Sequence, residues 1–91
     1  MTTNSQATMS LITLENQIIN TISWTLNVAP HRLQAYTHFV DDLHLDDIDM
    51  TLLIVSLEYQ LNLYLTSEEV AAVETMADLN KYFKLQLPVA A

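Results

Sequence analysis

The first third of the chain carries apolar residues at regular four-residue intervals. The members of this stripe are Leu14, Ile18, Ile22 and Leu26, with Leu11 and Ile19 beside them. Such spacing places side chains on one face of an α-helix, which then packs against a core. Ser10 is suited to cap this helix and Pro30 prevents its continuation, so the pattern predicts a helix that ends between Asn27 and Ala29.

The apolar pattern loses its period between Pro30 and Asp46. This predicts a long loop, and loops above about 12–15 residues without structure of their own are uncommon and often functional. We expect apolar side chains to anchor the loop to the core, namely Leu33, Tyr36, Phe39, Val40 and Leu43. Trp24 lies off the helical stripe, and we expect it, like Tyr36, to be a packing residue, with Trp24 at the edge of the bundle.

A second helix is predicted to begin at Asp46 or Asp47 and to end near Leu61 or Asn62. A carboxylate at a helix start accepts backbone N–H hydrogen bonds and suits the positive end of the helix dipole. The residues expected on the buried face of this helix are Ile48, Leu53, Ile54, Leu57 and Leu61.

Two capping-box signatures follow, Thr66 with Glu69 and Thr75 with Asp78. The first predicts a short helix to about Val73, and the second predicts a last helix that runs through Leu87. The expected fold is therefore an all-α four-helix bundle with three long helices, a short third helix and a long first loop. We expect this domain to cover residues 9–87, between a flexible N-terminal tail at 1–8 and a C-terminal tail at 88–91.

The composition supports one small folded domain, since 51% of the residues are hydrophobic and 15% are charged. Glycine is absent, so any turn that needs a positive φ has to use Asn, Asp or His. This favours helices joined by open loops over β-hairpins. Cysteine is absent too, which excludes disulfides, thiolate metal sites and thiol nucleophiles.

The net charge of −8 argues against binding to nucleic acid or to an anionic membrane surface. Basic proteins are the natural partners of such a chain. No apolar run is long enough for a membrane span, and the first ten residues do not have the pattern of a signal peptide. We expect a cytoplasmic protein.

Four short motifs occur in order along the chain: Leu26-Asn27-Val28, Phe39-Val40-Asp41-Asp42-Leu43, Thr66-Ser67-Glu68-Glu69 and Glu74-Thr75-Met76-Ala77-Asp78-Leu79. In sequence and spacing they resemble the acyl carrier protein family from about Leu14 to Phe83. The resemblance implies the same four-helix bundle. It also implies a 4'-phosphopantetheine arm on a serine at the start of helix two, and an acyl cavity lined by residues such as Ile54, Val70 and Val73.

The chain departs from this family at the attachment site. Carriers have Asp-Ser-Leu at the start of helix two, where this chain has Asp46-Asp47-Ile48, so Asp47 stands in the place of the serine. A carboxylate cannot form the phosphodiester, and Ser56 lies two turns further along the helix, too far to substitute. His44 replaces the usual glycine before the motif, which reduces the flexibility of the approach. We therefore expect no phosphopantetheine cofactor, and a cavity filled by core side chains.

Helix two also departs from the family on its outward side. Leu52, Tyr59 and Gln60 occupy places where carriers often have carboxylates. Leu52, Val55 and Tyr59 share one side of the helix, and such a strip serves either as an interface or as packing under helix three or the long loop. The candidate partner-binding residues are Asp46, Asp47, Asp49, Leu52, Val55, Glu58 and Tyr59.

Three other kinds of site are disfavoured by spacing. The cluster Asp46, Asp47 and Asp49 lacks the glycine and the later glutamate of an EF-hand loop, and helix capping explains it. His31, His38 and His44 match no zinc motif, and we expect solvent-facing loop histidines. A catalytic triad of Ser56, His44 and an aspartate would have no oxyanion hole, so we expect no enzymatic activity. From the spacing of the aspartates and histidines we expect no metal site.

The leading hypothesis is an acyl carrier protein-like interaction module without the attachment serine. It would bind a fatty-acid, polyketide or related biosynthetic enzyme that presents a basic docking patch, and self-association through helix two is a variant. The alternative is a genuine acyl carrier protein, a thioester shuttle whose serine at position 47 was mutated or recently lost. A third reading is an unrelated helical adaptor, which a different helix order or a short first loop would favour.

Overall fold

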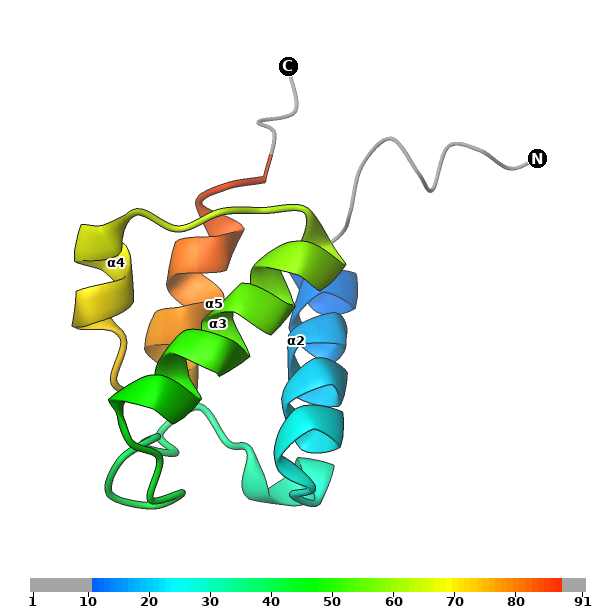
Figure 1. Ribbon diagram of the computed structural model, residues 1–91. Helices are drawn as coiled ribbons and strands as arrows, with labels where there is room; N and C mark the ends of the chain where they lie inside the picture. The colour runs from blue at the N-terminus through cyan, green and yellow to red at the C-terminus, as the bar shows by residue number, and fades with distance from the viewer. Residues whose placement is uncertain (1–10, 88–91) are drawn as a thin grey trace.

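The computed structural model describes residues 11–87, which form an all-α fold (Figure 1). Its elements are α2 (Leu11–Leu26), the 3-10 turn η1 (Pro30–Arg32), α3 (Asp47–Leu61), α4 (Ser67–Ala72) and α5 (Met76–Lys84). Helix α2 packs against α3 and α5, and the short α4 lies on the other side of the bundle (Figure 1). The predicted helix order, the short third helix and the long first loop are confirmed. The predicted Ser10 cap and the tails at 1–8 and 88–91 lie outside the described residues.

The helix starts follow the capping signatures of the sequence. Asp46, Thr66 and Thr75 are the N-caps of α3, α4 and α5, and each forms a reciprocal capping box with the residue three positions later. The final helix, α5, ends at Lys84 rather than at Leu87. Beyond Lys84 the chain continues in turns, in which the N–H of Leu87 donates to the Lys84 carbonyl.

Asparagine and histidine take the left-handed conformations that glycine usually supplies. Asn27, His44 and Asn62 have φ values of 56°, 60° and 55°. Asn27 follows the last residue of α2, and the next N–H, that of Val28, donates to the Ser23 carbonyl over 3.1 Å. This is the hydrogen bond of a Schellman ending. The expectation drawn from the absence of glycine is confirmed at these positions.

One hydrophobic core joins the helices and the long loop. Its buried members are Leu14, Ile18, Ile22, Leu33, Phe39, Leu53, Ile54, Leu57, Leu61, Val73, Met76, Leu79 and Phe83. Of the α2 stripe, Leu14, Ile18 and Ile22 are therefore confirmed as buried, while Ile19 and Leu26 pack partly against the core. The side chain of Leu11 lies outside the described part of the structure. Four of the five residues expected on the buried face of α3 are also confirmed. Ile48 is the exception, because its side chain is 69% exposed. It belongs to the first turn of α3 and lies four residues before Leu52, on the outward side of the helix.

The loop between η1 and α3 is held by backbone pairing as well as by apolar anchors. The N–H of Phe39 donates to the Glu74 carbonyl over 2.9 Å, and the N–H of Met76 donates to the Thr37 carbonyl over 3.0 Å. These bonds flank a bridge between His38 and Thr75. The loop is therefore fixed against the segment that leads into α5.

Two of the predicted loop anchors are wrong. Leu33 and Phe39 are buried and Leu43 packs partly against the core, but Tyr36 and Val40 are exposed. Thr37 is buried instead, where its hydroxyl donates to the Arg32 carbonyl over 3.0 Å and accepts from the Gln34 N–H over 2.9 Å. These bonds satisfy a buried hydroxyl, so a polar residue anchors the loop in place of Tyr36.

The expectation that Trp24 packs is also wrong. Its side chain is 89% exposed. The core-facing positions of α2 are taken by Ile18 and Ile22, and Trp24 points away from them. This exposed indole is a surface feature that needs another explanation.

Candidate functional site

The start of α3 contains three carboxylates in two different situations. The Asp46 carboxylate accepts from the Asp49 N–H over 2.8 Å, and the Asp49 carboxylate accepts from the Asp46 N–H over 3.1 Å. Both side chains are therefore committed to the helix cap. Asp47 is the first residue of α3, and within residues 11–87 its exposed carboxylate makes no hydrogen bond or ion pair. Of the three carboxylates, it is the one that is not committed to the helix cap.

The negative charge around this helix start is not neutralised by the described part of the chain. Asp41 and Asp42 are also exposed and precede α3 in the loop. The ion pairs among residues 11–87 are Lys84 with Glu15 and His38 with Asp41, and the latter exists only when the imidazole is protonated. None of them involves the carboxylates at the start of α3. An uncompensated cluster of this kind attracts basic groups and repels acidic ones.

Hydrogen bonds give the approach to α3 a defined shape. The Asp42 carboxylate accepts from the His38 N–H over 2.7 Å, and the His38 Nδ1 accepts from the N–H groups of Val40 and Asp41 over 3.2 and 3.0 Å. The N–H of His44 then donates to the Val40 carbonyl over 2.9 Å. His44 thus reaches the left-handed conformation within an ordered turn.

The outward side of α3 carries exposed apolar side chains. We name this set the outer strip, and its members Ile48, Leu52, Val55 and Tyr59 are 69%, 60%, 53% and 82% exposed. They follow one another at helical intervals of four, three and four residues, so they share one side of the helix. The sequence left the position of Leu52, Val55 and Tyr59 open, and the structure places them on the surface. It adds Ile48, which the sequence assigned to the core.

Glu58 has a structural partner inside the chain. Its carboxylate accepts from the Leu65 N–H over 2.9 Å and so fixes the connection that leads from α3 to α4. Its side chain is half-buried, unlike the carboxylate of Asp47. The candidate partner-binding residues that are exposed without such a role are therefore Asp47, Leu52, Val55 and Tyr59.

The residues considered for metal binding do not form a site. Within residues 11–87, no group of three His, Asp or Glu side chains is arranged to hold a metal ion. His31 and His44 are exposed as expected, while His38 is half-buried and uses its Nδ1 atom as an acceptor for the loop backbone.

The residues that the resemblance places around an acyl cavity belong to the core. Ile54 and Val73 are buried, and Val70 packs partly against the same cluster. Ser56 is half-buried on the side of α3 that faces α2, where it lines a shallow pocket together with Thr21 and Gln60. No helix of the described part of the chain is long and apolar enough to cross a membrane.

The helix order, the long first loop and the capped, acidic start of α3 define a four-helix bundle of the type found in carrier proteins. Comparison with known proteins supports this class. No family model matches the chain. The acyl carrier protein of Wolinella succinogenes is 32% identical over 59 residues, which cover 65% of this chain and 78% of the relative. That of Chlamydia trachomatis serovar L2 is 27% identical over 73 residues, covering 80% and 95%.

A solved structure of a candidate acyl carrier protein from Mycobacterium tuberculosis has the same fold. It superimposes with a TM-score of 0.72 at 24% identity and covers 79% of this chain and 96% of its own. The chain belongs to the acyl carrier protein family. The reading as an unrelated helical adaptor is therefore wrong.

Proposed function

We propose that this protein is an acyl carrier protein-like interaction module that works without a phosphopantetheine arm. In this proposal Asp47 occupies the position of the attachment serine and carries no cofactor. The protein binds a biosynthetic enzyme of fatty-acid, polyketide or related metabolism and catalyses no reaction itself.

The observation that carries this proposal is the combination of charge and apolar surface on one side of α3. Asp47 presents an unpaired carboxylate at the helix start, and Leu52, Val55 and Tyr59 continue from it as exposed apolar area. Exposed apolar area gathered in one place is typical of interaction surfaces, and the adjacent charge selects a basic partner. The partner is therefore a protein with a basic rim around an apolar groove.

The chemistry of position 47 supports the absence of a carrier function. Phosphopantetheine attachment requires a hydroxyl, and the Asp47 side chain supplies a carboxylate. Asp46 and Asp49 are occupied by the helix cap, and Ser56 is half-buried against α2. None of these side chains offers an exposed hydroxyl at the helix start.

A capture experiment tests the proposed surface. The tagged protein is incubated with an extract of its source cells, in parallel with the variants Asp47→Asn and Leu52→Asn. Glu68→Gln and Leu85→Asn are matched controls, because both parent residues are exposed and do not belong to α3. We expect Leu52→Asn to weaken binding of the captured partner at least about fivefold, and Asp47→Asn to weaken it by less. Binding by the parent protein should depend more strongly on salt than binding by Asp47→Asn, because the parent retains the charge of Asp47.

The controls define the outcome that would overturn the proposal. Equal partner recovery by the parent, Asp47→Asn and Leu52→Asn proteins would remove this surface from consideration. Circular dichroism of each variant shows whether the bundle remains folded, so a loss of binding is not confused with unfolding.

The second candidate function is a genuine thioester shuttle whose serine was lost at position 47. The family membership of the chain and the exposure of Asp47 favour it, because a modification site at a helix start has to be accessible. Asp47→Ser is incubated with coenzyme A and a promiscuous phosphopantetheinyl transferase, and its intact mass is measured. A mass gain in this variant identifies a latent carrier, whereas no gain shows that recognition by the transferase has also diverged.

A further inference from the structure

The outward side of α2 is free of charge in a strongly acidic protein. No Asp, Glu, Lys or Arg occurs between Asn16 and Pro30, although the chain carries eleven carboxylates and a net charge of −8. The exposed positions of this helix include Asn16, Gln17, Asn20 and Trp24. A solvated helix face without charged residues is unusual for such a composition, and it needs an explanation.

Shallow depressions surround Asn20 on this side of the molecule. One open pocket, with a volume of about 510 Å³, is lined by Asn20, Ser23, Trp24, Asn27, Val28 and Ala29. Asn20 also lines two neighbouring depressions that extend across to Gln60 of α3. No charged side chain lines any of the three. We name the surface formed by Gln17, Asn20, Trp24 and Gln60 the neutral face.

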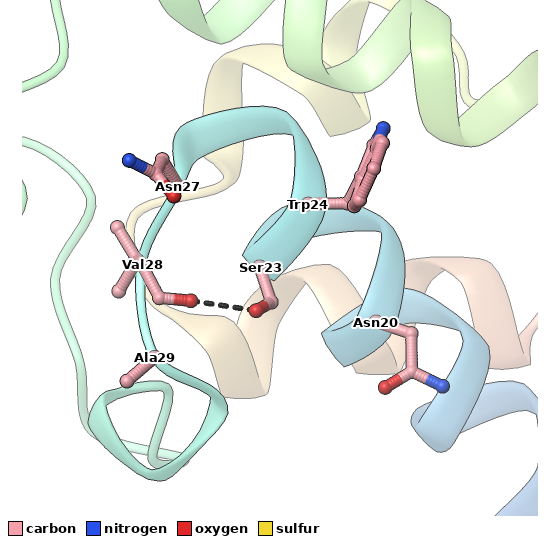
Figure 2. Close-up of a pocket in the computed structure, with 6 residues that line it drawn as sticks. All are labelled: Asn20, Ser23, Trp24, Asn27, Val28 and Ala29. Carbon is pink, nitrogen blue, oxygen red and sulfur yellow. Dashed lines mark hydrogen bonds between the residues drawn. The ribbon is translucent and has the colours of Figure 1, made fainter.

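The side chains of the neutral face do not converge on a small molecule. Figure 2 shows that Asn20, Trp24 and Asn27 point outward in different directions, while the Ser23 hydroxyl is turned back to donate to the Val28 carbonyl over 2.6 Å. Sites for small ligands need polar groups that converge within a concave pocket. An extended, shallow surface with one exposed indole fits a protein partner better, because Trp is enriched among the residues that dominate protein interfaces.

The chemistry of the neutral face selects a second copy of this chain as the occupant. Carboxamides carry both donors and acceptors, so a surface of Asn and Gln side chains can pair with an identical surface across a two-fold axis. A surface of carboxylates cannot, because it has acceptors only and repels its copy. Two molecules of net charge −8 can therefore approach most closely where neither presents a carboxylate.

We propose that the protein forms a two-fold symmetric dimer through the neutral face, with Trp24 of each copy buried at its centre. This proposal does not rest on the proposed function, because Asp47 and the outer strip are not part of the neutral face. The dimer is weak and concentration-dependent, since two acidic molecules repel each other at long range.

Sedimentation velocity over about 1 μM to 1 mM protein tests the proposal, a range that covers dissociation constants typical of weak complexes. Asn20→Asp adds one carboxylate per copy within the neutral face with little change in shape. We expect it to raise the dimer dissociation constant at least about tenfold at low salt, and by less at high salt, because salt screens the repulsion. Trp24→Ser is expected to abolish dimerisation under all salt conditions.

Ser67→Asp is the matched control, because it adds the same charge at an exposed position in the first turn of α4. It should leave the dissociation constant within about twofold of the parent value, since it lies outside the neutral face. A parent protein that stays monomeric throughout would overturn the proposal. A dimer that Asn20→Asp leaves intact would also overturn it. If Leu52→Glu dissociated that dimer instead, the contact would lie on the outer strip.

Discussion

Helix α3 carries apolar side chains on two sides, and the two sides meet different surroundings. Leu53, Ile54, Leu57 and Leu61 are buried in the core, whereas the outer strip of Ile48, Leu52, Val55 and Tyr59 faces solvent. Both sets have helical spacing, so the hydrophobic pattern alone does not distinguish them. The core that α3 shares with α2 and α5 covers only one of these sides. An apolar position on this helix therefore belongs either to the core or to the exposed surface, according to its neighbours.

Truncation on the buried side should have the largest effect on stability. Leu57→Ala removes a fully buried side chain from the centre of the core and leaves a cavity. We expect a loss of about 2–5 kcal/mol in the free energy of unfolding, measured by urea denaturation. A loss below about 1 kcal/mol would contradict the assignment of Leu57 to a well-packed core.

The next largest effect on stability should come from the start of α3, where substitution of Asp46 and of Asp47 should change the free energy of unfolding by different amounts. Asp46→Ala removes the side chain that accepts from the Asp49 N–H and should cost about 1 kcal/mol. Asp47→Ala removes only a favourable interaction with the helix dipole and should cost at most about 0.5 kcal/mol. Equal losses in the two variants would show that Asp47 is not the free carboxylate that the proposed recognition role requires.

A smaller effect should appear in the pH dependence of stability, through Asp78. Partial burial raises the pKa of this carboxyl group. Hydrogen bonds from the backbone of Glu74 and Thr75 and from the Thr75 side chain, together with the charge of Lys81, outweigh burial, so the pKa lies below its ordinary value.

The sign of this effect follows from the lowered pKa. The ionised Asp78 carboxylate stabilises the fold above about pH 4, and that stabilisation is lost as the pH falls through the folded-state pKa. Asp78→Asn should therefore show a shallower decrease in the free energy of unfolding below about pH 4. Denaturation curves of both proteins across this range provide the measurement, and identical slopes would exclude Asp78 as a source of the acid sensitivity.

The smallest effect on stability should come from the outer strip. Leu52→Ala is the counterpart of Leu57→Ala, because it makes the same substitution on the same helix at an exposed position. We expect a change within about 0.5 kcal/mol in urea denaturation. A loss approaching that of Leu57→Ala would mean that Leu52 packs within the fold, and the outer strip would then not be available to a partner.

Local chemistry predicted the starts of the helices well. Thr66 and Thr75 cap their helices as the acidic residue three positions later indicated, and Asp46, one of the two candidate starts, caps α3. These features depend on residues three positions apart, so a sequence contains the relevant information. The left-handed residues were predictable by type for a similar reason, because without glycine few residue types tolerate a positive φ.

Exposure and long-range pairing were harder to predict. Ile48, Trp24 and Tyr36 were expected to pack and are exposed, because which side of a helix or loop is covered depends on elements distant in the sequence. The bridge of His38 with Thr75 was not anticipated, since no local pattern marks it. The same limit applied to the outer strip, whose exposure could only be learned from the packing of α3 against α2 and from the core that α3 shares with α5.

The central claim is that this member of the acyl carrier protein family works through the surface of α3 and carries no prosthetic group. The most direct test is the intact mass of the chain isolated from its own cells, both free and in complex with its captured partner. The account predicts, in both forms, the mass that the amino acids alone explain. An added mass equal to one phosphopantetheine group on the partner-bound chain would contradict it.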